Sequence, residues 1–320
     1  MLRWLRASPA QKAAALLAAV ALTLALLYGV DAFAQRTING GVSGTYFALG
    51  AVGLTLVYGT LRLVNFAHGD MLTFGAYVAF LFNITLGVPV VLAALCAVAA
   101  TAALGVASER IMWRPMRAKR AGLLQLLLMA IGLAFVIRYT IQLIAGTAPR
   151  SLEVDVTSSI AFLGLRIGRT ELIVVVVGLA AVVAVVVMLR QTLLGKQMRA
   201  LADNFDLAEV SGIDTDRIVL ATWVFAGGLA GLAGVLLVAA IGSMTINIGF
   251  FVLLSLFAAV IVGGIGNAYG ALVGGMVIGL AQEWSTLVLD ARWKVAVGFA
   301  VLIAVLIVRP EGVFGKERTL

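Results

Sequence analysis

Long apolar segments recur along almost the whole chain, and they constrain its fold more than any other feature. A helix needs about 20 mainly apolar residues to cross the hydrocarbon core of a bilayer. The apolar runs lie at residues 13–30, 39–60, 69–86, 89–107, 122–145, 171–189, 218–241, 250–265, 270–289 and 295–308. The pattern predicts an all-α fold, a polytopic transmembrane bundle with about eight to ten spans.

One of these runs is shorter than most of the others. Residues 250–265 end in the sequence GGIG. Backbone that leaves helical geometry inside a membrane must be buried in protein or line a cavity. A partial or re-entrant segment is therefore the alternative to a full span at this position.

The composition excludes an ordinary soluble domain. Of the 320 residues, 62% are hydrophobic and only 12% are charged, whereas about a quarter of the residues in a soluble domain are charged. The mean hydropathy is +1.11. A single core cannot hide this much apolar surface, so membrane lipid must be part of the solvent.

Basic residues indicate the orientation of the chain. The net charge is +8, which in a soluble protein would suggest nucleic acid as a partner. Here the Lys and Arg residues lie in short loops between apolar runs, so we expect no nucleic acid. If every run crosses, most of them lie on the side of the N-terminus, in the segments 1–12, 61–68, 108–121, 190–217 and 309–320. The positive-inside rule then predicts that both ends face the cytoplasm.

The N-terminal segment, residues 1–38, has two interpretations. A basic start, an apolar stretch and the sequence AFAQ, in which Ala32 and Ala34 fit an A-x-A cleavage site, are typical of a removed signal peptide. The apolar stretch is long for a signal peptide, and an extra span is the alternative. We expect residues 39–315 to form the transmembrane domain and residues 316–320 a cytoplasmic tail.

The polar segment 146–170 is predicted to lie outside the membrane. Leu152, Val154 and Val156 alternate with polar residues, as in a small hairpin. We interpret this segment as an outer cap.

Several glycines are spaced as in closely packed membrane helices. The pairs with GxxxG spacing are Gly40 and Gly44, Gly227 and Gly231, Gly270 and Gly274, and Gly275 and Gly279. Small residues let transmembrane helices approach closely and pack by van der Waals contact. We therefore expect helix packing, not ligand binding, at most of these positions.

Motifs for chemistry are absent from the sequence. There is no G-x-x-x-x-G-K-[ST] motif, and the residues LGKQ at 194–197 lack both its first glycine and its Ser/Thr. The chain has one histidine and one cysteine, which excludes a disulfide within the chain and metal sites built from several His or Cys residues. We find no hydrolase triad or redox pair. The sequence therefore predicts a protein that is not an enzyme and binds no metal or cofactor itself.

The predicted cytoplasmic loop 196–217 carries an apolar stripe. Met198, Leu201, Phe205 and Ala208 recur at steps of three and four residues, which predicts one short amphipathic helix. Gly212 suits the end of this helix, and Asp214 or Thr215 could cap the next one. A helix lying on lipid headgroups is usually basic, but this loop is rich in acids. We therefore favour a docking helix for a cytoplasmic partner over a headgroup-bound helix.

Four segments together resemble one known family. These are NGGVSGTYFALGAVGLTLVYGTLRLVNFAHGDMLTFGAYV at 39–78, RALADNFDLAEVSGIDTDRI at 199–218, AVIVGGIGNAYGALVGGMVIG at 259–279 and RPEGVFG at 309–315. In order and content they resemble the branched-chain amino acid permease family of ABC importers. The sequence NFAHG, followed by an acid and then GAY, is the most specific of these signatures.

The resemblance implies a function and a set of partners. It implies an inner-membrane (plasma membrane) permease subunit of a bacterial importer, forming half of the path for branched-chain or similar small apolar amino acids. The implied partners are a second similar permease, two cytoplasmic ATPase subunits that use ATP and Mg²⁺, and an external solute-binding protein. Asp206, Leu207 and Ala208 precede Gly212 with the spacing of the wider importer coupling pattern, although the match is loose. The predicted ATPase-coupling residues are Arg199, Leu201, Ala202, Asp203, Asn204, Phe205, Ala208, Glu209 and Gly212.

Polar residues inside the predicted membrane segments are functional candidates, because charged groups there are costly. Asn65, His68, Gly69 and Asp70 are predicted to lie at the cytoplasmic end of a pair of spans. We expect Asn65 and His68 to bond exposed backbone at a helix break near Gly69, beside the translocation path. Direct substrate contact is the alternative.

Two charged residues lie in the outer halves of predicted spans. Arg138 is expected to snorkel outward along its stem. Alternatively, Arg138 pairs with Glu283 inside the bundle, as a gate or a packing lock.

Other functions stay open at this point. The same machinery could carry urea, short amides or aromatic acids, because the external binding protein usually sets the selectivity. A self-sufficient channel or secondary carrier is a second alternative, but a carrier needs coupling-ion residues near the middle of the membrane. The chain offers few candidates for that role.

Overall fold

The computed structural model describes residues 9–155, 157–162 and 164–315. The predicted tail 316–320, Val156 of the predicted hairpin and the first eight residues lie outside the described residues. The elements are α2 (Pro9–Tyr28), α3 (Val30–Leu61), α4 (His68–Phe80), η1 (Leu81–Thr85), α5 (Val90–Ser108), η2 (Glu109–Trp113), α6 (Arg114–Ala118), α7 (Leu123–Ala145), β1 (Ser159–Phe162), β2 (Leu165–Gly168), α8 (Arg169–Gln191), α9 (Leu193–Asp203), α10 (Phe205–Val210), α11 (Thr215–Ile241), α12 (Ile248–Gly263), α13 (Ala268–Ser285), η3 (Ala291–Trp293) and α14 (Lys294–Val308).

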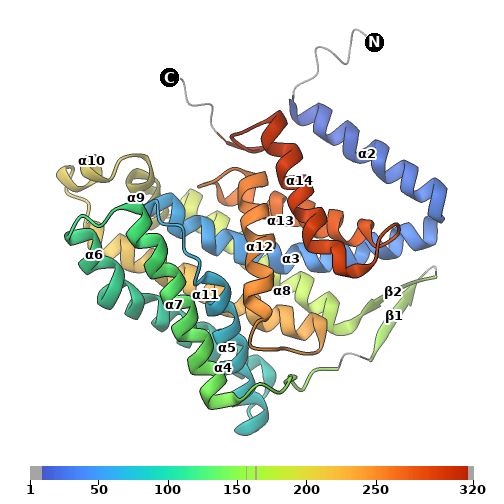
Figure 1. The fold of residues 1–320 in the computed structure, drawn as a ribbon, viewed down its shortest axis with the longest axis horizontal. Helices are drawn as coiled ribbons and strands as arrows, with labels where there is room; N and C mark the ends of the chain where they lie inside the picture. Colours follow the sequence, from blue (N-terminus) through green and yellow to red (C-terminus); the bar gives the residue numbers. More distant parts are fainter. Residues whose placement is uncertain (1–8, 156, 163, 316–320) are drawn as a thin grey trace.

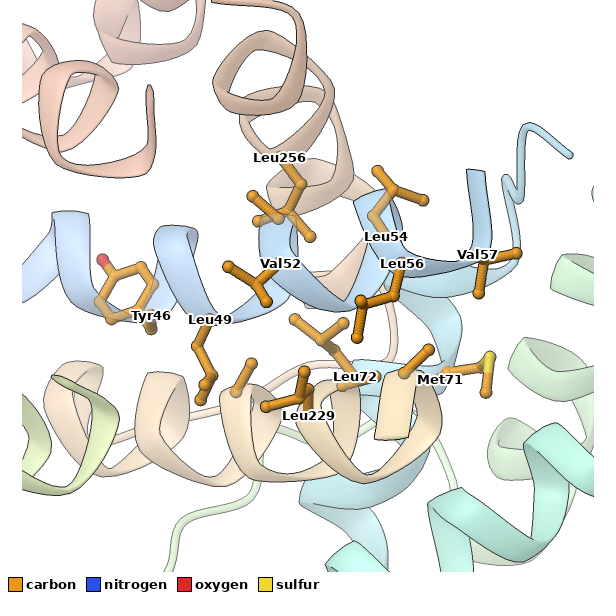
Figure 2. Close-up of a cluster of buried hydrophobic side chains, with 14 of the residues drawn as sticks. Tyr46, Leu49, Val52, Leu54, Leu56, Val57, Met71, Leu72, Leu229 and Leu256 are labelled. Atoms are coloured by element: carbon orange, nitrogen blue, oxygen red, sulfur yellow. The ribbon is translucent and has the colours of Figure 1, made fainter. Parts of the chain in front are cut away.

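Helix α3 is the centre of the bundle. Nearly all of its side chains between Gly40 and Thr60 are buried, and α12 crosses over it in Figure 1. In Figure 2, Leu256 of α12 lies on one side of α3, and Leu72 of α4 and Leu229 of α11 lie on the other. A helix that is apolar all round is buried in this way when neighbours cover every face.

The outer helices have the opposite pattern, which suits lipid. Among the described residues, six helical segments are long and apolar enough to cross a membrane: Val30–Leu61, Val90–Ala118, Leu123–Ala145, Arg169–Gln191, Thr215–Ile241 and Ala291–Val308. Only a minority of the residues of α5, α7, α8 and α14 are buried by the rest of the chain. The all-α polytopic fold predicted from the apolar runs is therefore confirmed.

The short run at 250–265 forms a short helix. α12 has 16 residues, which corresponds to about 24 Å at 1.5 Å per residue and is less than the roughly 30 Å of a hydrocarbon core. It ends at Gly264, whose φ of +103° is left-handed. A helix of this length fits the expectation of a partial segment.

The two ends of the bundle carry different structures. In Figure 1, α6, α9 and α10 lie at one end and the β1–β2 hairpin lies at the other. Arg62, at the end of α3, donates from Nη2 to the carbonyl oxygen of Ala202 at 2.9 Å. Two of the loops predicted to be cytoplasmic, 61–68 and 190–217, thus meet at one end of the bundle.

The GxxxG pairs lie at helix contacts, as predicted. A Cβ atom added at Gly44 of α3 would lie 2.9 Å from the Cα atom of Met276 in α13, and one added at Gly279 would meet the backbone of Gly44. Gly231 of α11 lies against α5, where a Cβ atom would be 2.9 Å from the carbonyl oxygen of Ala97. Gly274 of α13 lies even closer to α12, where a Cβ atom would meet the carbonyl oxygen of Ala259. These glycines allow the helix backbones to touch.

The outer hairpin forms later in the chain than predicted. β1 and β2 pair antiparallel from Ser159 opposite Gly168 to Phe162 opposite Leu165, so the hairpin around Leu152 and Val154 is wrong. Leu152 is buried, and Arg150 instead forms an isolated antiparallel bridge with Met244. The backbone N–H of Val154 donates to the carbonyl oxygen of Leu152 at 2.9 Å, so the alternating residues form a tight turn and not a strand.

The predicted domain boundary at residue 38 does not coincide with a helix end. α3 begins at Val30 and continues through residue 38 without interruption. Removal of a signal peptide and an extra span both stay predictions.

Candidate functional site

The predicted docking helix consists of two helices, not one. α9 ends at Asp203, and Asn204 has extended backbone with φ of −155° and ψ of 109°. Its Oδ1 atom accepts a hydrogen bond from the backbone N–H of Leu207 at 3.0 Å, which caps α10. A single helix is therefore wrong, because the asparagine side chain competes for backbone donors and starts a new helix.

The break changes which residues form the apolar stripe. Met198, Leu201 and Ala208 are buried, as the spacing predicted. Phe205 is 37% exposed and does not belong to this stripe, because α10 restarts the helical phase at this residue. The predicted helix end at Gly212 is confirmed, since this residue has a left-handed φ of +85°. The predicted cap of the next helix is Asp214, which accepts from the backbone N–H of Arg217 at 3.0 Å.

A cleft of about 540 Å³ opens between this segment and the ends of α3 and α6. Among the residues that line the cleft are three arginines and four acids: Arg62, Arg114, Arg117, Asp203, Asp206, Glu209 and Asp216. Of the predicted coupling residues, the structure brings together Leu201, Ala202, Asp203, Phe205 and Glu209 here. Outside the cleft, Arg199 donates to the carbonyl oxygen of Leu189, at the end of α8.

Apolar side chains on α10 are exposed beside this cleft. Leu207 is 60% exposed and Val210 is 80% exposed. The acids Asp206 and Glu209 each directly precede one of these two residues in the sequence. A short helix with uncovered apolar side chains among charged ones has the form expected of a segment that seats in a partner's groove.

A buried carboxylate next to the cleft was not predicted. Glu109 is 2% exposed and accepts from both terminal nitrogens of Arg117 and from the indole Nε1 of Trp223 at 2.8 Å. It begins the π-helical turn η2, which also buries Trp113 against Trp223 with ring centroids 6.1 Å apart. From sequence alone, Glu109 reads as an ordinary loop acid, because Trp223 is distant in the chain.

The polar cluster at 65–70 lies deeper than predicted. His68 Nε2 is 3.0 Å from the carbonyl oxygen of Gly50, and Gly50 lies 11 residues before the end of α3, which is about 16 Å of helix. The chain between the two helices therefore folds back along α3, so the predicted position at the cytoplasmic end is wrong. The break spans residues 62–67, and Gly69 lies inside α4.

The cluster has the backbone-bonding role that we expected. Asn65 Oδ1 accepts from the backbone N–H of Ala67 at 3.0 Å, within the break. Gly69 lies so close to Gly249 of α12 that a Cβ atom would meet that backbone. Thr73 accepts from the backbone N–H of Gly249 at 3.0 Å. The start of α4 is thus fixed to both α3 and α12.

Asp70 and Arg138 form a buried ion pair. Arg138 Nε donates to Asp70 Oδ1 at 2.8 Å and Nη2 donates to Oδ2 at 2.9 Å. Snorkelling is therefore wrong, because Arg138 is only 8% exposed. The pair with Glu283 is also wrong: Glu283 binds Lys294 and accepts from Ser43 Oγ at 3.4 Å. The packing of α4 against α7 places Asp70 within bidentate reach of Arg138.

The arrangement of His, Cys, Asp and Glu side chains shows whether a metal ion could be held. Among the described residues, no three His, Cys, Asp or Glu side chains gather closely enough to hold a metal ion. The charged side chains inside the bundle are instead paired with one another, as at Asp70 and Arg138.

The fold and these sites define a class of protein: a multi-pass helical membrane protein with buried ion pairs inside the bundle and an exposed helical segment at one end. Residues 36–306 match the family described as the branched-chain amino acid transport system permease component. The chain belongs to this family, which confirms the resemblance seen in its motifs. It is a membrane transport protein of the amino acid transport type.

Individual relatives agree with the family. The chain is 33% identical over 298 residues to the high-affinity branched-chain amino acid transport system permease protein LivH of Salmonella typhimurium, covering 89% of this chain and 96% of the relative. LivH of Escherichia coli K12 has the same identity and coverage. BraD of Pseudomonas aeruginosa is 30% identical with the same coverage. No solved structure matches the chain.

Proposed function

We propose that this chain is the permease subunit of an ATP-driven importer and forms half of the path for branched-chain or similar small apolar amino acids. The observation that carries the proposal is the family match over residues 36–306. The permease relatives that the chain resembles are named for high-affinity branched-chain amino acid transport. The absence of a P-loop motif from the sequence supports a division of labour in which ATP is bound elsewhere.

The proposed assembly has three kinds of partner besides lipid. A second, similar permease completes the path, two cytoplasmic ATPase subunits use ATP and Mg²⁺, and an external solute-binding protein delivers the cargo. This chain binds no cofactor in the scheme. The protein lies in a bacterial inner membrane with its C-terminus in the cytoplasm, as the distribution of basic loops favours.

The α9–α10 segment is the proposed connection to the ATPase. Its exposed apolar side chains, Leu207 and Val210, would seat in a groove of that subunit. The bond from Arg62 to Ala202 ties this segment to the end of α3, and the cap at Asn204 fixes the start of α10 directly after α9. Closure of the ATPase pair would therefore move the central helix, and the two permeases would alternate their opening.

Reconstitution tests the proposal against a channel or carrier. We expect vesicles that contain the complete importer and internal ATP to accumulate leucine, and vesicles with this chain alone to accumulate none. Uphill accumulation by the chain alone would overturn the proposal. Urea, a short amide or an aromatic acid replacing leucine as cargo would show the same machinery with a different selectivity.

Variants of α10 test the docking surface. Leu207→Asp and Val210→Asp should each prevent co-purification of the ATPase and abolish ATP-dependent uptake, because a charge cannot enter an apolar groove without loss of its hydration. Val288→Asp is the matched control, since Val288 is 60% exposed in a turn at the opposite end of the bundle. Equal ATPase binding by all three variants would refute docking through α10.

A further inference from the structure

The ion pair of Asp70 and Arg138 leaves one edge of the guanidinium group unused. Asp70 is completely buried, and both of its oxygens accept from Arg138. These two bonds use Nε and Nη2; among the described residues, Nη1 has no acceptor within hydrogen-bond distance. The pair therefore presents a fixed donor edge, but no carboxylate oxygen, to anything outside it.

Two aromatic rings lie near the guanidinium group of Arg138. The guanidinium carbon of Arg138 lies 4.7 Å from the centroid of the Phe250 ring and 5.8 Å from that of Phe135. Phe135 also stacks on Tyr139, with centroids 6.0 Å apart. Phe135 and Tyr139 belong to α7 and Phe250 to α12, and the contacts of Phe135 and Phe250 with the guanidinium are within cation–π range.

The same rings lie on an uncovered face of the bundle. Phe135 is 47% exposed, Tyr139 58%, Phe250 42% and Phe251 59%. The charged pair is thus separated from the surroundings of the chain by a single layer of rings. Charged side chains in membrane segments face the interior of an assembly or a water-filled cavity, because lipid solvates them poorly. The face formed by α7 and α12 should therefore turn away from lipid.

We propose that Arg138 binds the carboxylate of an apolar amino acid on a water-filled path between this face and the second permease subunit. Phe135, Tyr139 and Phe250 form the wall for the apolar side chain of the cargo. This inference rests on the proposed function and adds the cargo contact to it.

The chemistry of the site suits transient binding of a zwitterion. A guanidinium edge recognises carboxylates through paired N–H donors, and Asp70 keeps Arg138 oriented without itself touching the cargo. Because Asp70 already neutralises Arg138, the attraction for a carboxylate is weaker than that of a lone cation. A path requires binding that is favourable enough for entry and weak enough for release.

Labelling of introduced cysteines tests the position of the path. In a Cys96→Ala background of the complete importer in vesicles, Tyr139→Cys and Phe250→Cys should react with a charged, water-soluble thiol reagent at least tenfold faster than two control positions. The controls are Val176→Cys on α8 and Leu95→Cys on α5, which are 59% and 60% exposed and so comparable to Tyr139. Equal rates at the four positions, or no reaction at 139 and 250, would overturn the inference, since lipid would then cover this face.

Protection from labelling tests the ligand class. Leucine should slow the reaction of Phe250→Cys several-fold, whereas leucinol, which lacks the carboxylate, should not. Adding the double substitution Asp70→Asn with Arg138→Gln, which leaves no unpaired charge, should remove the protection by leucine. Protection by both compounds, or its survival in the double variant, would show that Arg138 does not bind the carboxylate.

Uptake separates this inference from the proposed function. The Asp70→Asn, Arg138→Gln importer should lose at least tenfold in leucine uptake while its ATP hydrolysis changes less than twofold. Glu283→Gln with Lys294→Met, which neutralises another ion pair with a buried carboxylate, is the control and should keep its uptake. Normal uptake in the first variant refutes the cargo contact alone, whereas failure of the unsubstituted importer to take up leucine refutes the proposed function.

Discussion

The contact between α3 and α13 allows a sharp prediction, because Gly41 and Gly44, three positions apart on α3, have different surroundings. A Cβ atom at Gly44 would lie 2.9 Å from both the Cα and the Sδ of Met276, whereas one at Gly41 would have no atom within 4 Å. Carbon atoms pack best at about 3.5–4.0 Å. Gly44→Ala therefore requires α3 and α13 to separate by roughly 0.6–1.1 Å, and Gly41→Ala requires no movement.

The magnitude follows from two opposing terms. Replacing glycine by alanine inside a helix stabilises it by about 1 kcal/mol, and this term is shared by both variants. Overpacking a close contact costs about 1–3 kcal/mol, and only Gly44→Ala has this cost. The free energies of unfolding of the two variants should therefore differ by about 1–3 kcal/mol, with Gly41→Ala at or above the original protein.

Unfolding by SDS in mixed micelles, followed by tryptophan fluorescence, measures this difference directly. Gly279→Ala should lie at the upper end of the range, because its Cβ atom would meet the backbone of Gly44, which cannot rotate away. Stabilities of the Gly41 and Gly44 variants within about 0.5 kcal/mol of each other, the scatter of surface substitutions, would refute the reasoning.

Three further predictions concern polar contacts. Trp223→Phe removes one donor from the buried carboxylate of Glu109 and should lower the free energy of unfolding by about 1.5–3 kcal/mol in the same assay. Asn204→Ala removes the N-cap of α10 and should lower the stability of this helix by about 1 kcal/mol. Amide hydrogen exchange in α10 should therefore be about five times faster. The backbone N–H of Ser158 and neighbouring donors lower the pKa of Asp155 below 3.8. The hydrogen bonds to the Asp155 carboxylate are therefore present above pH 3.8 and are lost as the pH falls through the lowered pKa. Amide hydrogen exchange at Ser158 should become faster in that lower pH range. The substitution Asp155→Asn should abolish this pH dependence.

Features that depend on neighbouring residues were predictable from sequence. The cap at Asp214 and the left-handed Gly212 require only local chain geometry. The glycine pairs were predictable because spacing alone places two small residues on one helix face, although the spacing does not tell which helix fills the gap. The break at Asn204 was missed because asparagine suits both the middle of a polar loop and the start of a helix.

Features that depend on distant residues were predicted incorrectly. Arg138 was assigned to Glu283 or to the membrane surface, yet its partner is Asp70. The error has one cause: the chain after Leu61 turns back along α3 and places the start of α4 beside its middle, at Gly50. The sequence pattern does not show in which direction the segment 62–67 leaves the end of α3.

The sequence by itself determined the medium, the helical class and the family, because apolar length and local motifs are read along the chain. Only the tertiary structure decided which charges meet. An ion pair between residues 68 positions apart, Asp70 and Arg138, depends on how α4, α7 and α12 pack in space. Burial then selects the partner, since a charge without one is too costly inside the bundle.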